Sequence, residues 1–105
     1  MLIKTLKIVD DNSKPDTVEM DTKFNIGDRI TMQYDWCSKT PCINGNKLNW
    51  HIGTAEFTVS NMVCNMLLFP HEVWMRLHTK DRNFINRCGC DEFDAPEQQV
   101  LKRIV

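Results

Sequence analysis

The chain has 105 residues, of which 13 are basic and 14 are acidic, so its formal net charge at pH 7 is −1. This balance excludes a global positive field toward phosphate backbones, and nucleic-acid binding would need a local basic patch. The hydrophobic fraction of 42% is that of a globular domain, and no apolar run is long enough to span a bilayer. The first residues lack the long apolar region of a secretory signal. We therefore expect a single cytoplasmic domain over residues 1–105, without a membrane partner.

Two strands are expected at the start of the chain. Residues 2–9 place most of their aliphatic side chains on one face, which predicts a first strand. Residues 10–16 are a run of turn formers and predict a loop. Residues 17–21 then predict a short second strand.

The chain is expected to be organised around a central strand at residues 50–63. Apolar or small side chains alternate there with polar ones, which is typical of a strand with one buried face. Gly53 lies near its start, where a missing Cβ permits a bulge or the close approach of another backbone. Residues 29–34 alternate in the same way and predict its antiparallel partner. Residues 35–49 between them contain many turn formers and predict a projecting flap that is not regular throughout.

The last third of the chain is expected to be mainly helical. Residues 66–69 form an apolar run that periodicity assigns neither to a strand nor to a buried helix. Pro70 suits a first helical turn, and apolar residues recur at helical spacing through Arg87. This pattern predicts a helix over one side of the sheet, with or without a break near Thr79. Asp94 is predicted to cap a last helix. Its inward-facing residues would be Val100, Leu101 and Ile104.

The five cysteines are expected to be reduced, because their number is odd and no export signal precedes them. Cys37 and Cys42 could converge with Cys88 and Cys90 on zinc, but the spacings lack a Cys-x-x-Cys knuckle. We therefore predict no metal and no other cofactor. Cys64 is expected to face the core.

Three motifs occur in order along the chain: Ile-Gly-Asp-Arg-Ile at 26–30, His-Ile-Gly-Thr-Ala-Glu-Phe at 51–57 and Asp-Glu-Phe-Asp-Ala-Pro-Glu at 91–97. They resemble the strand entry, the central strand and the last helix start of the ASCH branch of the PUA-like superfamily. The resemblance implies an α+β fold, a small PUA-like (ASCH-like) mixed β-barrel with two or three covering helices. It also implies an association with RNA.

The resemblance also implies a set of catalytic positions. In the small ASCH proteins that resemble acetylcytidine amidohydrolases, a loop lysine and threonine work with an acidic residue before the last helix. The matching positions are Lys14, Thr17 and Asp91. A threonine nucleophile with a lysine base is coherent chemistry. The glycine and arginine of that family loop are absent here, so binding is favoured over catalysis, and the alternative is that these are solvated loop and turn residues.

The predicted flap carries the candidate ligand-binding residues. Aromatic side chains interleaved with lysines can stack on bases and meet phosphates of a single-stranded nucleic acid. The alternative is that the tryptophans cover the open end of a barrel. Together with the loop lysine and the histidine at the strand entrance, the predicted set is Lys14, Trp36, Lys39, Lys47, Trp50 and His51.

Three functions remain open at this point. The first is an RNA- or nucleotide-binding PUA-like module. The second is a virus-encoded protein inhibitor that uses the flap or an open sheet edge to bind and block a larger host enzyme. The third is a small amidohydrolase that acts on an acylated cytidine-type nucleoside.

Overall fold

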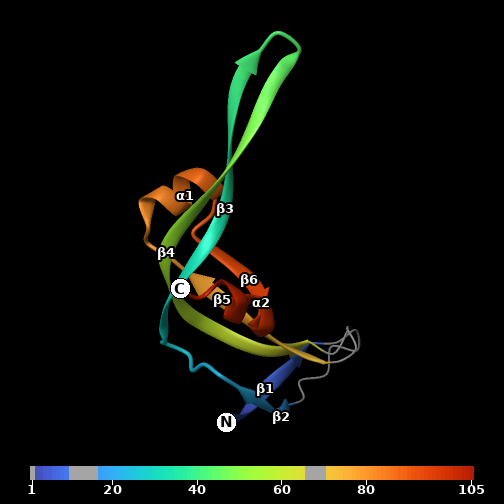
Figure 1. The fold of residues 1–105 in the computed structure, drawn as a ribbon. Helices are drawn as coiled ribbons and strands as arrows, with labels where there is room; N and C mark the ends of the chain where they lie inside the picture. The colour runs from blue at the N-terminus through green and yellow to red at the C-terminus, as the bar shows by residue number, and fades with distance from the viewer. Residues whose placement is uncertain (1, 10–16, 66–70) are drawn as a thin grey trace.

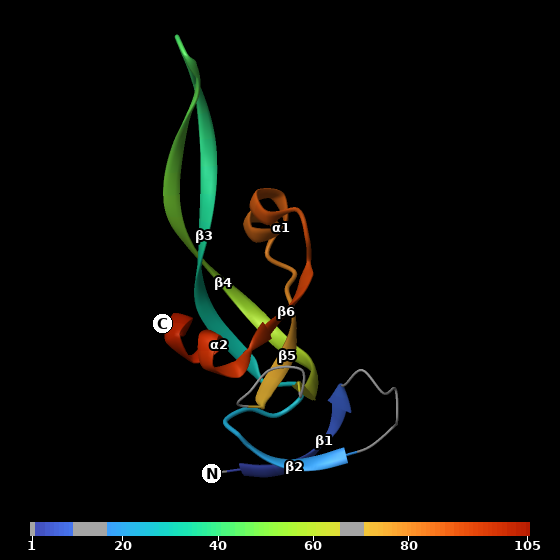
Figure 2. The same ribbon diagram turned by 90° about the vertical axis from the view of Figure 1, so that its right-hand side faces the viewer.

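The computed structural model describes residues 2–9, 17–65 and 71–105, which form one sheet and two short helices (Figures 1 and 2). The elements are β1 (Leu2–Val9), β2 (Thr17–Thr22), β3 (Arg29–Cys42), β4 (Gly45–Asn65), β5 (Glu72–His78), α1 (Arg82–Cys88), β6 (Glu92–Pro96) and α2 (Glu97–Arg103). The fold is therefore mostly β, and among the described strands the sheet is open. The predicted loop at 10–16 and the apolar run at 66–69 lie outside the described residues.

Strand β4 lies at the centre of the sheet, as the alternation of residues 50–63 predicts. The strand order is β2-β1-β4-β5-β6, and β3 pairs with β4 outside this path. β4 pairs with β1 in parallel and with β3 and β5 in antiparallel orientation. Its inward side chains Phe57, Val59 and Cys64 are at most 1% exposed, so the core lies on this face of β4. The two predicted N-terminal strands are confirmed as β1 and β2, which pair antiparallel.

The predicted irregular flap is instead a regular hairpin, and that prediction was wrong. β3 and β4 pair without a break from Arg29↔Thr58 to Cys42↔Gly45. The turn formers fit because cross-strand bonds support the ribbon, as between Asn49 Nδ2 and Thr40 Oγ1 at 2.9 Å. A two-stranded ribbon also tolerates Pro41, since it has solvent edges where a missing donor costs little. The hairpin does project, as predicted, and extends far beyond the sheet (Figures 1 and 2).

The predicted helix from Pro70 to Arg87 was wrong over most of its described length, and Pro70 itself lies outside the described residues. Residues 72–78 form strand β5, in which Val73, Met75 and Leu77 alternate inward and are buried. Trp74 faces outward, and its apolar ring produced the apparent helical spacing. Only Arg82–Cys88 is helical.

The predicted break near Thr79 separates β5 from α1. Thr79 is buried, and its Oγ1 donates to the Glu56 carbonyl at 2.8 Å. Asp81 caps α1, since its carboxylate accepts the N–H of Phe84 at 2.9 Å. The hydrogen bond of the Thr79 side chain thus follows the end of strand β5, and helix α1 begins shortly after it.

The last helix begins three residues later than predicted. Asp94 is not its cap but a residue of β6, and its carboxylate accepts from Arg76 at 2.9 Å. Strand pairing with β5 therefore overrides the local capping signal. α2 buries Val100 as expected, whereas Leu101 and Ile104 are exposed.

Gly53 lies where the sheet becomes the hairpin, and the predicted close approach is made there by a side chain. A Cβ at this position would lie 2.5 Å from Cζ of Tyr34. The Tyr34 ring cannot easily move, because it packs edge-on against Phe84 at 4.9 Å and accepts a hydrogen bond from Arg87 at 3.1 Å. The bulge lies elsewhere in β4, between Val59 and Asn61.

We therefore expect Gly53→Ala to lower the free energy of unfolding by about 1–3 kcal/mol, because the added methyl group overpacks the Tyr34 ring. Urea denaturation followed by circular dichroism measures this. The matched control is Thr54→Ala on the exposed side of the same strand, for which we expect about 0.5 kcal/mol or less. Equal losses for the two variants would contradict the close packing at Gly53.

Candidate functional site

The described residues do not bring the predicted catalytic residues together. Thr17 begins β2, opposite Lys7 of β1. Asp91 is exposed just before β6, where its carbonyl accepts the N–H of Thr79 at 2.9 Å. β2 and β6 are the two ends of the strand order, so Thr17 and Asp91 adjoin opposite edges. Lys14 lies outside the described residues, and the set of three stays a prediction.

The predicted binding residues of the hairpin are divided between its two faces. Residues directly opposite each other in an antiparallel pair share a face. Trp36 pairs with His51, and Lys47 pairs with Thr40, on the face that continues the core. Trp50 pairs with Cys37, and Lys39 with Leu48, on the other face. The predicted residues therefore form two surfaces rather than one patch.

Trp36 belongs to a structural brace at the base of the hairpin. Its ring stacks on His51 with centroids 4.3 Å apart, and the Arg87 guanidinium lies 4.2 Å from the Trp36 centroid. His51 Nε2 in turn shares a hydrogen bond with Ser38 Oγ at 2.9 Å. Protein groups thus already occupy the stacking surfaces of Trp36, which favours a covering role over base stacking for this tryptophan.

Trp50 lies in an exposed apolar row that we call the hairpin stripe, which consists of Leu48, Trp50 and Ile52. These are alternate residues of β4 and therefore project from one face. All three are exposed. Lys39 is the basic residue directly beside this row, opposite Leu48.

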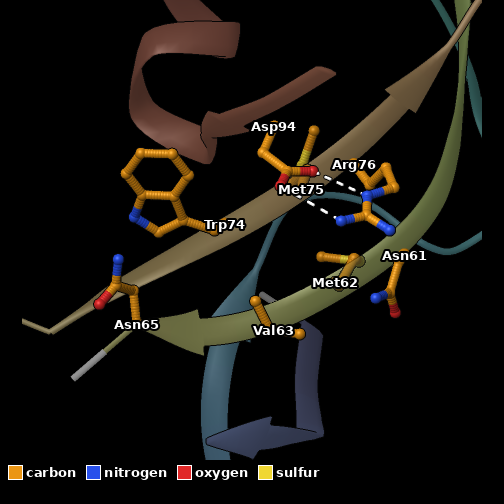
Figure 3. A pocket seen from close by; sticks show the side chains of 8 residues that line it. All are labelled: Asn61, Met62, Val63, Asn65, Trp74, Met75, Arg76 and Asp94. Carbon is orange, nitrogen blue, oxygen red and sulfur yellow. Dashed lines mark hydrogen bonds and ion pairs between the residues drawn. The ribbon is translucent and has the colours of Figure 1, made fainter. Parts of the chain in front are cut away.

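A pocket that the sequence did not predict lies on the outer face of the sheet (Figure 3). Its volume is about 370 Å³, and its lining comes from β4, β5 and Asp94 of β6. On this face, residues that pair across neighbouring strands form rows. In the middle row, Val63 of β4 pairs with Trp74 of β5. A polar row joins Asn61, Arg76 and Asp94 on one side, and Asn65 lies opposite Glu72 on the other. We call this the sheet-face pocket.

Trp74 provides a flat surface in the sheet-face pocket. Its Nε1 donates to Glu72 Oε2 at 3.2 Å, which fixes the rotation of the indole. In Figure 3 the ring is seen nearly face-on, beside Asn65 and above Val63. The row of Trp74 and Val63 continues across the sheet, because Val63 also pairs with Lys7 of β1. Lys7 in turn pairs with Thr17 of β2. One amide, that of Asn65, thus lies next to the ring, Asn61 lies at the other end of the pocket beside Arg76, and a lysine lies further along the same row as the ring.

Arg76 adds a positive charge that is held in place by carboxylates. Its Nε donates to Asp94 at 2.9 Å and lies 3.5 Å from Glu92. The hydrogen bond and charge of Asp94, followed by the charge of Glu92, raise the pKa of Arg76 further. Because the guanidinium has five donors, it can hold Asp94 and still donate to a ligand. The pocket can therefore bind a planar polar ring, with hydrogen bonds to the ring edge.

Period-2 alternation over residues 72–78 was the signal that could have found this site. It places Trp74 and Arg76 on the face opposite Val73 and Met75. The helical interpretation of this segment hid that arrangement.

The described cysteines are all free thiols. Cys64 is buried as predicted, and burial raises the pKa of its thiol. Burial and the neighbouring Cys90 raise the pKa of Cys88, against the opposing effect of Arg87. Within residues 2–9, 17–65 and 71–105, no group of three or more His, Cys, Asp or Glu side chains could hold a metal ion.

Comparisons with known proteins give no family for this chain. No protein-family model, no curated protein and no solved structure matches it. Of the helices in the described part of the chain, neither is long and apolar enough to cross a membrane.

We expect Cys64 to resist maleimide labelling in the folded protein at pH 7.5, whereas exposed Cys42 is labelled within minutes. A raised pKa leaves less thiolate at any pH below it, and the thiolate is the nucleophile. Peptide mass spectrometry after timed labelling measures both sites in one sample, with urea-unfolded protein as the control. Equal labelling rates at Cys64 and Cys42 in the folded protein would contradict the buried position of Cys64.

Proposed function

We propose that this chain is an RNA- or nucleotide-binding module that stacks a base on Trp74 in the sheet-face pocket. The observation that carries the proposal is an indole on a sheet face with amide side chains at both ends of the hollow. Sheet-surface aromatic residues stack on unpaired bases in RNA-binding modules. The amide of exposed Asn61 has both a donor and an acceptor, which suits the edge of a base.

The charges on this face suit a short, weakly held nucleotide segment. Lys7 and Arg76 are the cations of the rows that cross the pocket, and they can meet one phosphate each. Glu72 and Asp94 lie beside them and repel further phosphates. Stacking and edge hydrogen bonds therefore supply most of the proposed affinity.

The PUA-like assignment, with closure into a barrel, is part of the same proposal. It is supported by the order of the three sequence motifs and by the corner at Gly27-Asp28. Gly27 has φ +96°, and its N–H donates to the Val59 carbonyl at 2.7 Å. The N–H of Val59 donates in turn to the Asp28 carbonyl at 2.9 Å. The Gly-Asp motif thus joins the entry of β3 to the central strand.

We expect Trp74→Ala to weaken binding of a four-nucleotide RNA about 5- to 150-fold, since stacking of one base on an aromatic ring is worth about 1–3 kcal/mol. Fluorescence anisotropy with labelled tetra-uridine and tetra-adenosine measures the affinity. Trp50→Ala is the matched control, because it removes an exposed tryptophan from the hairpin instead. Loss of binding with Trp50→Ala but not with Trp74→Ala would overturn the proposed site.

A second candidate is the virus-encoded protein inhibitor, which is supported by the open edges of the hairpin. Outside the turn, residues 37–50 of the hairpin pair only with each other among the described strands, so both edges can accept another strand. The amidohydrolase alternative has no comparable support, because among the described residues Thr17 and Asp91 are not in contact and Lys14 lies outside them.

Salt dependence separates the first two candidates. Two phosphate contacts by Lys7 and Arg76 predict a slope of about −1.4 for log affinity against log salt, and Lys7→Gln reduces its magnitude by about 0.7. Isothermal titration at several salt concentrations measures this slope for RNA. A protein partner that binds a hairpin edge predicts a slope near zero and unchanged binding by Lys7→Gln. A protein bound in this way from a host lysate, with no RNA bound, would favour the inhibitor.

A further inference from the structure

The hairpin stripe is an apolar surface that no described part of the chain covers. Leu48 is 53% exposed, Trp50 71% and Ile52 69%. Residues 48–52 belong to the part of β4 that pairs only with β3, and this ribbon projects away from the rest of the sheet (Figure 2). Contiguous large apolar side chains on a projecting element mark an interaction surface rather than ordinary surface scatter.

The stripe includes a hollow that can receive a side chain. This hollow has a volume of about 390 Å³ and is lined by Asp35, Trp50, His51 and Ile52. Asp35 lies at one side of it, directly opposite Ile52 in the β3–β4 pair. An apolar side chain entering from outside would therefore lie between Trp50 and Ile52, close to a carboxylate.

The residues of this face follow one another in a self-complementary order. Three successive rows pair Asp35 with Ile52, Cys37 with Trp50, and Lys39 with Leu48. Consider a second copy related by a two-fold axis that lies in the plane of the interface. If this axis is perpendicular to the strands and passes through the row of Cys37 and Trp50, the three rows of the second copy run in the opposite order.

The charges and the apolar residues match under this symmetry. Asp35 of each copy lies opposite Lys39 of the other, which forms two equivalent ion pairs. Leu48 of each copy lies opposite Ile52 of the other, at the hollow beside Trp50. The two Trp50 rings meet at the centre. The result is an apolar centre with charged residues at its margin, which is the usual arrangement of a protein interface.

We propose that the hairpin stripe binds a second copy of this chain, as a symmetric dimer in which the two hairpins pack face to face and antiparallel. A nucleic acid suits this face poorly, because its rows carry one lysine and one aspartate. The brace of Arg87, Trp36 and His51 on the opposite face holds the base of the hairpin before association, which lowers the ordering cost.

The dimer is expected to be weak. A standard interface buries about 800 Å² on each partner, and a few rows of a two-stranded ribbon bury less, so we expect a Kd of roughly 10–100 µM. Asp35 already lies 3.5 Å from Arg103, but both side chains are exposed, and such pairs contribute little. Asp35 is therefore free to turn toward the second copy.

Charge exchange between positions 35 and 39 tests the proposal. The parent protein of this experiment is Arg103→Gln, and all variants carry the same substitution. A lysine at position 35 then does not face the Arg103 guanidinium. Sedimentation velocity from about 5 to about 500 µM measures the dimer Kd. Asp35→Lys and Lys39→Asp are each expected to weaken the dimer at least about tenfold, because each places like charges opposite each other twice. The double variant Asp35→Lys/Lys39→Asp restores opposite charges and is expected to return to within about threefold of the parent.

Two further variants complete the experiment. Trp50→Glu is expected to abolish the dimer, whereas Lys47→Asp on the opposite face leaves it unchanged, and circular dichroism confirms folding of each variant. A parent protein that is monomeric at every concentration would overturn the proposal. Failure of the double variant to recover, with its fold intact, would overturn the proposed symmetry. The RNA-binding proposal is independent of either result, because it depends on the opposite end of β4.

Discussion

The structure depends on the change that strand β4 makes at Gly53. After Gly53 in the sequence, Ala55, Phe57 and Val59 face a core shared with β5. Pairing of β4 with β5 ends at Thr58, and beyond Gly53 toward the hairpin turn no side chain of β4 is buried. Tyr34 packs on the bare Cα of Gly53 and closes the core at that point. A side chain at position 53 would displace Tyr34 and separate the hairpin from its support.

The brace at the hairpin base follows from the same packing. Arg87 is carried by α1, and it reaches both the Tyr34 hydroxyl and the Trp36 ring. Asp81 and Gly89 set the ends of α1 and thereby the position of Arg87. The short helix therefore both buries Phe84 in the core and positions the guanidinium of Arg87. Arg87 thus joins the base of the long hairpin to α1, and the Trp36–His51 stack joins the two strands of the hairpin.

The two proposed association surfaces lie toward opposite ends of β4. The sheet-face pocket lies where β4 pairs with β5, and the hairpin stripe lies near the other end of the strand. A dimer through the stripe would place two sheet-face pockets far apart in one particle. Weak sites that are joined in this way bind a single RNA more tightly than either site alone, if the RNA spans them.

Alternation of apolar and polar residues predicted β1, β2 and β4, because each has one buried face and no competing pattern. The hairpin was missed because Pro41 and Asn44 are turn formers by local preference, and only the register with β4 shows that they are accommodated. At β5 the outward Trp74 imitated a helical repeat. At Asp94 a local capping motif competed with pairing to Arg76, which is distant in sequence. The sheet-face pocket was missed for the same reason: period-2 alternation over residues 72–78 places Trp74 and Arg76 on one face, but its rows exist only across strands.

The most direct test of base stacking on Trp74 is to observe which tryptophan contacts RNA. The chain has three tryptophans, and each gives one indole N–H signal in a nitrogen-15 correlation spectrum, assignable by Trp→Phe substitution one at a time. If a base stacks on Trp74, titration with tetra-uridine shifts the Trp74 signal in a saturable way and leaves those of Trp36 and Trp50 in place. A shift confined to Trp50, or no shift at Trp74 at saturating RNA, would contradict base stacking in the sheet-face pocket.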